Sequence, residues 1–226
     1  LTVTHFQLSV PSALATARLW LAEERVQRVL FGAVDELSEL IGYIRYRTRD
    51  ASPVAPMTPL RTEMETSIPA EGAAFLLLAR ENASRGGYCT LDASTAGSLP
   101  IPGFPFPEPG LLVLGADGCR ESGQRYAAVA QNARVACYTP LYGSMPAGPA
   151  FDLAAAALIL KGGRVFPSPG CAFRDFPATV PGGGEPVGAD RISCLTLAGD
   201  EAYGLTTLGK LPGTTGECAR EERSSP

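Results

Sequence analysis

Short apolar runs that alternate with helix-forming stretches constrain the fold of this chain more than any other feature of its sequence. The runs at residues 29–32, 71–78 and 111–114 have the length and composition of buried strands. Helices are predicted over residues 11–24, 122–131 and 149–161, and a closing hairpin over residues 191–197 and 202–208. Strands that alternate with helices are typical of an α/β fold.

Local signals set the expected boundaries of these elements. Thr2 to Phe6 is β-prone and leads into the first helix, for which Ser12 is the expected N-cap. The helix at 149–161 has a proline near its start and ends at Gly162-Gly163, as helix punctuation prefers. Prolines and glycines between residues 93 and 110 predict a connector. The expected organisation is therefore a first half at 1–92, a connector at 93–110, a second half at 111–211 and a polar tail at 212–226.

Composition excludes several classes of function. The 226 residues carry a net charge of −4, which gives no basic footprint for nucleic acid. No apolar run approaches the roughly 18 residues that cross a bilayer, so no membrane contact is expected. One histidine and six dispersed cysteines without a C-x-x-C pair predict no metal site. We interpret the cysteines as reduced, mostly buried thiols of a cytoplasmic protein, and no cofactor is expected.

Other polar clusters have simple structural interpretations. Gly182-Gly183-Gly184 lacks the lysine or fingerprint of a phosphate-binding loop and is interpreted as a flexible loop. A serine hydrolase built on Ser9 or Ser144 would need histidine partners that one histidine in a poor position, His5, does not supply. Asp35-Glu36 is interpreted as a solvated turn. Arg45, Arg47 and Arg49 are interpreted as a solvated face, with contact to an acidic carrier protein as the alternative.

Four segments resemble, in order, the motifs of one enzyme family. Residues 68–78 are similar to a Gly-x-x-x-Gly-Glu-Gly-Ala strand, and residues 111–119 to the strand that leads into a His-Gly-Thr-Gly-Thr motif. Residues 142–148, the helix after them and Val165 to Pro169 are similar to a Gly-His motif, an Ala/Gly-rich helix and a Val-x-Pro-Pro exit. Residues 192–200 occupy the place of a Gly-Phe-Gly-Gly turn. These motifs belong to the β-ketoacyl synthases of the thiolase superfamily, which have a layered α/β/α fold.

The positions that carry chemistry in that family are changed in this chain. Counting back from Gly32 at the family spacing places the nucleophilic cysteine at Gln7, and the two catalytic histidines fall at Asp117 and Ser144. The family lysine falls at Thr139, and the glycine-rich turn reads Leu197-Ala198-Gly199-Asp200. An amide cannot form a thioester, and the two histidines that drive malonyl decarboxylation are absent from these positions. The resemblance therefore implies no active catalytic residue, and a pocket bordered by Gln7, Ser9, Ala198 and Gly199.

A glutamine at the nucleophile position makes the chain most similar to the chain-length factor, the inactive subunit of type II polyketide synthases. That resemblance implies an active ketosynthase subunit and an acyl carrier protein as partners, and a role in shaping the acyl-chain pocket. The alternative is a ketosynthase-type acyltransferase with residual activity such as malonyl decarboxylation. The resemblance covers about residues 1–208 and only the later part of a ketosynthase, so we expect the sheet of the first half to lack its opening strands. Either the true N-terminus is missing from this sequence, or another polypeptide completes the fold.

Overall fold

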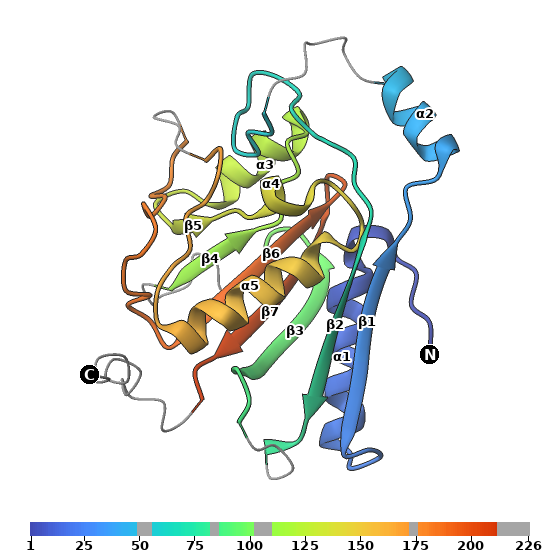
Figure 1. Ribbon diagram of the computed structural model, residues 1–226, viewed down its shortest axis with the longest axis vertical. Helices are drawn as coiled ribbons and strands as arrows, with labels where there is room; N and C mark the ends of the chain where they lie inside the picture. Colours follow the sequence, from blue (N-terminus) through green and yellow to red (C-terminus); the bar gives the residue numbers. More distant parts are fainter. Residues whose placement is uncertain (49–55, 82–85, 102–109, 172–175, 212–226) are drawn as a thin grey trace, which may run out of the picture.

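Two β-sheets of unequal size organise the computed structural model, which describes residues 1–48, 56–81, 86–101, 110–171 and 176–211 (Figure 1). The smaller sheet pairs β1 (Arg28–Asp35) with β2 (Gly72–Ala79). The larger sheet has the strand order β3-β7-β6-β4-β5. Its strands are β3 (Thr90–Ser98), β4 (Leu111–Leu114), β5 (Arg134–Ala136), β6 (Arg191–Ala198) and β7 (Ala202–Gly209).

The larger sheet is mixed, and its parallel part determines where the site lies. β4 runs parallel to both β5 and β6, whereas β7 pairs antiparallel with β6 and β3 pairs antiparallel with β7. Because β4, β5 and β6 point the same way, the segments that follow them leave the sheet at one common edge.

Helices cover both faces of the larger sheet. Helix α5 (Gly148–Gly162) packs on β6, β7 and β4 and closes one apolar cluster, to which it contributes Leu153, Ala156 and Ile159. Helix α3 (Arg120–Val129) contributes Tyr126 to the cluster on the opposite face. The remaining helices are η1 (Phe6–Leu8), α1 (Ser9–Ala22), α2 (Glu39–Thr48) and α4 (Thr139–Tyr142). The part of the chain that the structure describes has no helix long and apolar enough to span a membrane.

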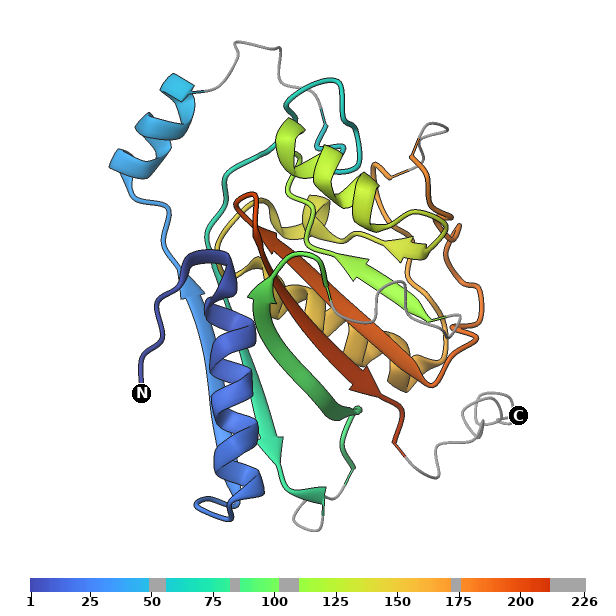
Figure 2. The ribbon, with the colours of Figure 1, turned by 180° about the vertical axis from the view of Figure 1, so that it is seen from behind.

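Helix α1 joins the two sheets. It packs on β1 of the smaller sheet and also on β3 and β7 of the larger one, as the view from behind shows (Figure 2). The carboxylate of Asp35, at the end of β1, accepts a hydrogen bond from the backbone N–H of Ala147, the N-cap residue of α5. Asp35 was predicted to lie in a solvated turn. That prediction is wrong, because the Asp35 carboxylate is bonded to the start of α5.

Most predicted elements are present. The closing hairpin is confirmed, and α5 ends as expected at Gly163, which has a left-handed φ of 68° and donates its N–H to the carbonyl of Ile159 over 2.8 Å. Helix α2 was not predicted, and it lies away from both sheets (Figure 1). Residues 93–98, predicted as part of a connector, continue strand β3 and pair with β7.

The predicted start of the first helix is wrong. Residues 1–5 form no strand and pair with none of the described strands. A tight turn replaces the predicted strand, since Leu8 donates its N–H to the carbonyl of His5 over 2.9 Å. The His5 N–H is in turn bonded to Ser9 Oγ over 2.6 Å. Helix α1 then begins at Ser9, so the predicted N-cap, Ser12, lies inside it.

Candidate functional site

Three of the predicted site segments meet at the carboxyl edge of the parallel strands. Asp117 follows β4, Thr139 follows β5, and Ala198-Gly199 form the turn at the end of β6. The pairing of β4 with β6 continues beyond the strand, because Gly115 donates its N–H to the carbonyl of Leu195 over 2.9 Å. The topology therefore gathers positions that are up to 82 residues apart in the sequence, Asp117 and Gly199.

Asp117 and Ser144, the two predicted histidine positions, are in contact. Ser144 Oγ donates to Asp117 Oδ2 over 3.4 Å, and Asp117 Oδ1 accepts the N–H of Cys119 over 3.2 Å. Ser144 is buried and is held by the segment before β2, since its N–H is bonded to the carbonyl of Ile68 over 2.7 Å. The structure thus pairs a carboxylate with a hydroxyl at the positions where the family resemblance implies two imidazoles.

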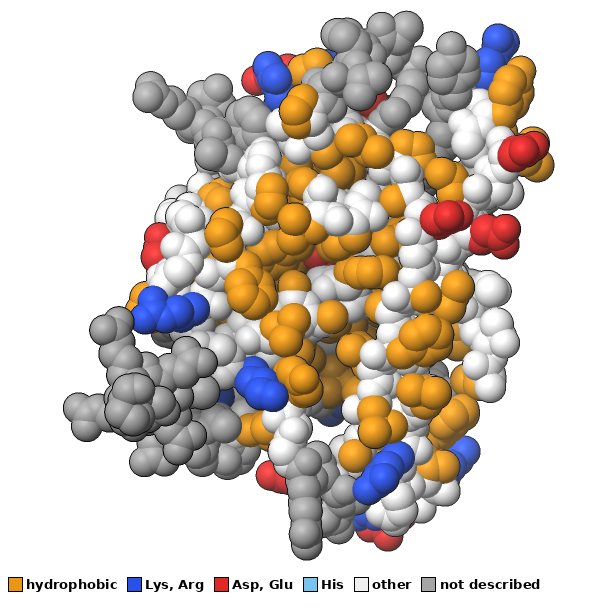
Figure 3. All heavy atoms as spheres, viewed as in Figure 1, with side chains coloured by type: hydrophobic (Ala, Val, Ile, Leu, Met, Phe, Trp, Pro, Cys, Tyr) orange, Lys and Arg blue, Asp and Glu red, His pale blue; other side chains and the backbone are white. Residues whose placement is uncertain are grey.

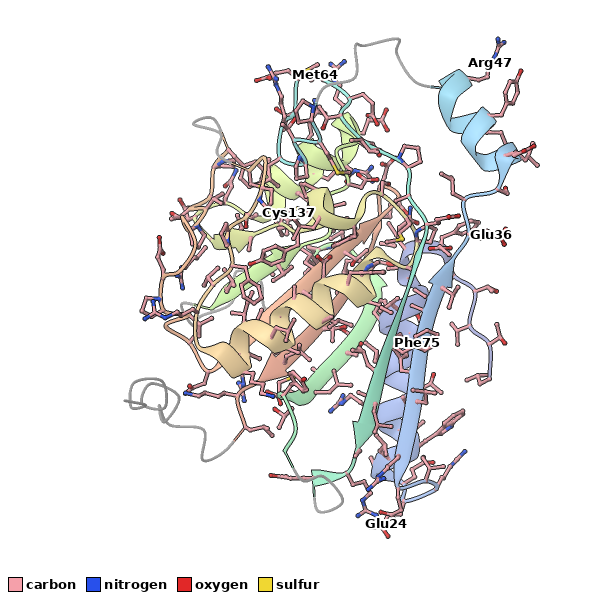
Figure 4. The ribbon with its side chains drawn as sticks, in the orientation of Figure 1. Glu24, Glu36, Arg47, Met64, Phe75 and Cys137 are labelled. Atoms are coloured by element: carbon pink, nitrogen blue, oxygen red, sulfur yellow. The ribbon has the colours of Figure 1, made fainter. Side chains whose placement is uncertain are left out.

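Thr139 follows β5 at the same carboxyl edge of the larger sheet. It is buried, and its Oγ1 is 3.5 Å from the sulfur of Cys137, which lies between β5 and α4 (Figure 4). The Cys137 thiol also donates to the carbonyl of Ala116 over 3.4 Å. No ammonium group takes the place of the family lysine at position 139, so this position contributes packing and a neutral hydroxyl.

Gln7 lies on the turn before α1, and that turn packs against the end of the larger sheet. Helix η1, which contains Gln7, contacts both β6 and β7. The Gln7 side chain is exposed, whereas its neighbour Leu8 is buried. Phe6 has a left-handed φ of 45°, so the strain of the turn falls one residue before the predicted nucleophile position. Ser9, a predicted pocket residue, uses its hydroxyl to close this turn.

The space behind the turn is almost filled. A cavity of about 10 Å³ lies between the N-termini of α1 and α5 and the ends of β6 and β7. It is lined by Val10, Pro11, Pro149, Leu153, Cys194, Thr196, Gly204 and Thr206. Such a volume holds at most one water molecule. A wider surface hollow of about 530 Å³ is lined by Leu21, Ala22, Arg80 and Glu81, beyond the opposite end of α1.

A buried acid that the family motifs did not identify lies beside this region. Asp152, on α5, is almost fully buried and accepts a hydrogen bond from the Tyr142 hydroxyl over 2.6 Å. Burial raises its pKa from 3.8 to about 7, and the Tyr142 hydrogen bond opposes that rise. Gly115 packs against it, since a Cβ at residue 115 would lie 3.4 Å from Asp152 Oδ2. The signal available in the sequence was a single acid in an otherwise apolar helix.

Two cysteines near the site, Cys119 and Cys194, are poor nucleophiles. Burial, followed by the charges of Asp117 and Glu65, raises the pKa of Cys119 far above its ordinary value. Burial likewise raises the pKa of Cys194, which lines the small cavity. The reactive species of a thiol is the thiolate, so neither residue substitutes for the missing nucleophile.

Solved structures of ketosynthases share this arrangement of sheets and helices. The ishigamide ketosynthase/chain length factor superposes with a TM-score of 0.69 at 13% identity, over 89% of this chain. The chain has the thiolase-like ketosynthase fold. A ketosynthase from module 6 of the bacillaene synthase of Bacillus subtilis 168 superposes over 90% of the chain, with a TM-score of 0.71 at 13% identity.

A third structure with this ketosynthase fold is a type II polyketide synthase acyl-carrier protein in complex with its ketosynthase, at a TM-score of 0.68 and 16% identity over 91% of this chain. The chain spans 58%, 46% and 61% of the lengths of these three proteins, in the order given. Neither a family model nor a curated protein matches the sequence.

Proposed function

We propose that this chain is a non-catalytic ketosynthase-like subunit that pairs with an active ketosynthase and shapes the pocket for a growing acyl chain. The observation that carries the proposal is the contact between Asp117 and Ser144 at the sheet edge where ketosynthase chemistry needs two histidines. Similarity to a ketosynthase/chain length factor and to a type II ketosynthase supports the polyketide context.

Residue chemistry opposes acyl transfer at this site. A glutamine amide is not a nucleophile toward a thioester, and Gln7 occupies the turn from which an acyl chain would be held. The thiols of Cys119 and Cys194 have raised pKa values, so they do not replace it.

Residue chemistry also opposes decarboxylation. Loss of CO₂ from a malonyl thioester needs hydrogen-bond donors for the enolate oxygen that develops. The Asp117 carboxylate has no such donor and repels both the malonyl carboxylate and the enolate. Ser144 Oγ already donates to Asp117, which leaves its single proton engaged.

The decisive experiment measures acyl transfer and malonyl decarboxylation in three samples. These are the pure chain, an active ketosynthase alone, and a mixture of the two proteins. We expect the pure chain to give background rates, and the pair to give products whose length depends on this chain. Ala198→Phe, placed in the turn beside η1, should shorten the products of the pair. Turnover by the pure chain would instead support the residual-activity alternative, and product length independent of Ala198 would contradict a pocket-shaping role.

A further inference from the structure

Two free cysteines, Cys137 and Cys171, meet beside the candidate site although they are 34 residues apart in the sequence. Cys137 directly follows β5, and Cys171 lies in the segment that follows α5. Cys171 Sγ is 3.8 Å from the carbonyl oxygen of Cys137, and the two thiols interact directly with each other. Both residues are fully buried, so their contact belongs to the packed interior.

The two segments that carry these cysteines are held together at further points. Ser168 bonds both cysteines, because its Oγ accepts the N–H of Cys137 over 3.2 Å and its carbonyl accepts the N–H of Cys171 over 3.4 Å. The Tyr138 hydroxyl donates to the carbonyl of Phe166 over 3.2 Å, and the two rings meet edge to face. Segments fixed in this way hold their thiols at a high effective concentration toward each other.

The Cys137 thiol is also bonded to the candidate site. It donates to the carbonyl of Ala116, the residue before Asp117, over 3.4 Å, and it lies 3.5 Å from Thr139 Oγ1. Figure 4 shows Cys137 in this position, beside β5 and α4. A covalent change at this sulfur therefore acts directly on neighbours of two of the predicted site positions.

The pair differs from the other cysteines that the structure describes. The hydrogen bond with Cys137, followed by burial, raises the pKa of Cys171 far above its ordinary value. Cys171 therefore holds its proton, while Cys137 is the thiol of the pair that can attack. Within the described part of the chain, no thiol hydrogen bond joins Cys89, Cys119 or Cys194 to another cysteine.

We propose that Cys137 and Cys171 are a peroxide-responsive pair that closes into a reversible disulfide. The Cys137 thiolate attacks one oxygen of hydrogen peroxide, the O–O bond breaks, and hydroxide leaves with the proton that Cys137 gave up. The resulting sulfenic acid on Cys137 is attacked by the Cys171 sulfur, the S–O bond breaks, and water leaves. The two thiols together lose two electrons, and the peroxide is reduced to two molecules of water.

Closure of the disulfide alters the candidate site. It removes the proton that Cys137 donates to Ala116, and it ties the segment beyond α5 covalently to the end of β5. Hydrophobic side chains gather over α4 and α5, so peroxide reaches the buried pair only when this region opens transiently (Figure 3). The disulfide should therefore form slowly. This inference goes beyond the proposed function and depends only on the contacts between the two segments.

Peptide mapping of the full chain after exposure to hydrogen peroxide tests the proposal. Mass spectrometry without reduction should find the peptides of Cys137 and Cys171 joined, and dithiothreitol should separate them. Cys194 is the internal control, since it is also buried but has no thiol bonded to it. We expect the Cys137 thiol to be consumed roughly tenfold or more faster than the Cys194 thiol. Equal rates for these two thiols, or disulfides that join Cys137 to other cysteines as often as to Cys171, would overturn the proposal.

Cys171→Ser provides a second test that identifies the attacking sulfur. Serine has nearly the same shape, but it cannot close a disulfide, so oxidation of Cys137 should stop at the sulfenic acid. Dimedone, which labels sulfenic acids, should mark Cys137 in this variant at least roughly tenfold more than in the native chain. Cys194→Ser is the matched control and should be labelled like the native chain. Equal labelling of Cys137 in the native chain and in Cys171→Ser would contradict the proposal. Neither test measures turnover of malonyl thioesters, so its result is independent of the proposed function.

Discussion

The hydroxyl of Tyr142 donates a 2.6 Å hydrogen bond to the carboxylate of Asp152, an acid buried inside an apolar helix. The pair lies beside Gly115, on the segment that leads from β4 to Asp117. Because burial raises the pKa of Asp152 from 3.8 to about 7, the native state holds a proton that the unfolded chain releases. Stability should therefore fall as the pH rises from about 4 to about 7, and this contribution should be constant above that range.

Asp152→Asn should remove this pH dependence. The amide has no charge to bury, and its oxygen still accepts the Tyr142 hydroxyl. At pH 8 we expect the variant to be more stable than the native chain, by roughly 4 kcal/mol at most. At pH 4 the free energies of unfolding of the variant and the native chain should be close. Urea unfolding at both pH values measures the difference, with Asp190→Asn, at an exposed site, as the control. An equal difference in the free energy of unfolding between variant and native chain at both pH values would contradict a buried acid with a raised pKa.

Gly143→Ala should destabilise the segment that carries Ser144. Gly143 has a left-handed φ of 79°, and a Cβ there would overlap Ala70 and lie 3.1 Å from the carbonyl oxygen of Ile68. We expect a loss of about 2–4 kcal/mol, from backbone strain and overpacking together. Gly163→Ala is a matched control with a φ of 68° and open space around it, so it should lose only about 1–2 kcal/mol. Thermal or urea unfolding of both variants measures the contrast, and equal losses would show that packing at Gly143 is looser than described.

Asp35→Ala should weaken the attachment of the smaller sheet to α5. Asp35 accepts the N–H of Ala147 at the start of that helix, 112 residues away in the sequence. Loss of a helix cap typically costs about 1 kcal/mol. Amide exchange should also become faster at Ala147, because its donor loses its partner. Glu36→Ala, at an exposed neighbouring position, is the control, and protection at Ala147 that is unchanged in Asp35→Ala would contradict the cap.

The sequence predicts β4, β6 and β7 of the larger sheet and helix α5 because their signals are local. Helix α5 has a proline near its start, glycines at its end and an apolar interior, and β6 and β7 flank a short turn. These local signals do not depend on which parts of the protein pack against the element. The β1 and β2 runs were predicted as buried strands on the same grounds, and the strands are present. Their outward side chains are exposed, because burial depends on neighbours that a run of residues does not specify.

The candidate site is predicted only in part, because its contacts also depend on neighbours that the local sequence does not specify. The alignment with ketosynthase motifs placed Asp117 and Ser144 at separate positions, and the topology brings them into contact. The Asp152–Tyr142 pair lies outside any motif, and a single acid in an apolar helix carries no information about its partner. The start of α1 was misplaced because the prediction relied on a side-chain cap, whereas the N-cap residue of α1 is Leu8 and makes no side-chain cap hydrogen bond.

Gln7→Cys should create an accessible thiol without restoring catalysis. Residue 7 is exposed on the turn two residues before α1, and the N-terminus of a helix favours a thiolate. Iodoacetamide at pH 7.5 should modify this thiol roughly tenfold or more faster than Cys119, whose pKa is raised by burial and by Asp117. Mass spectrometry of the peptides separates the two sites, and the native chain supplies the Cys119 rate. Condensation should stay at background, because Asp117 and Ser144 still replace the two histidines. Slower modification at position 7 than at Cys119 would show that the turn is covered, and condensation by this single variant would show that an imidazole pair is not required.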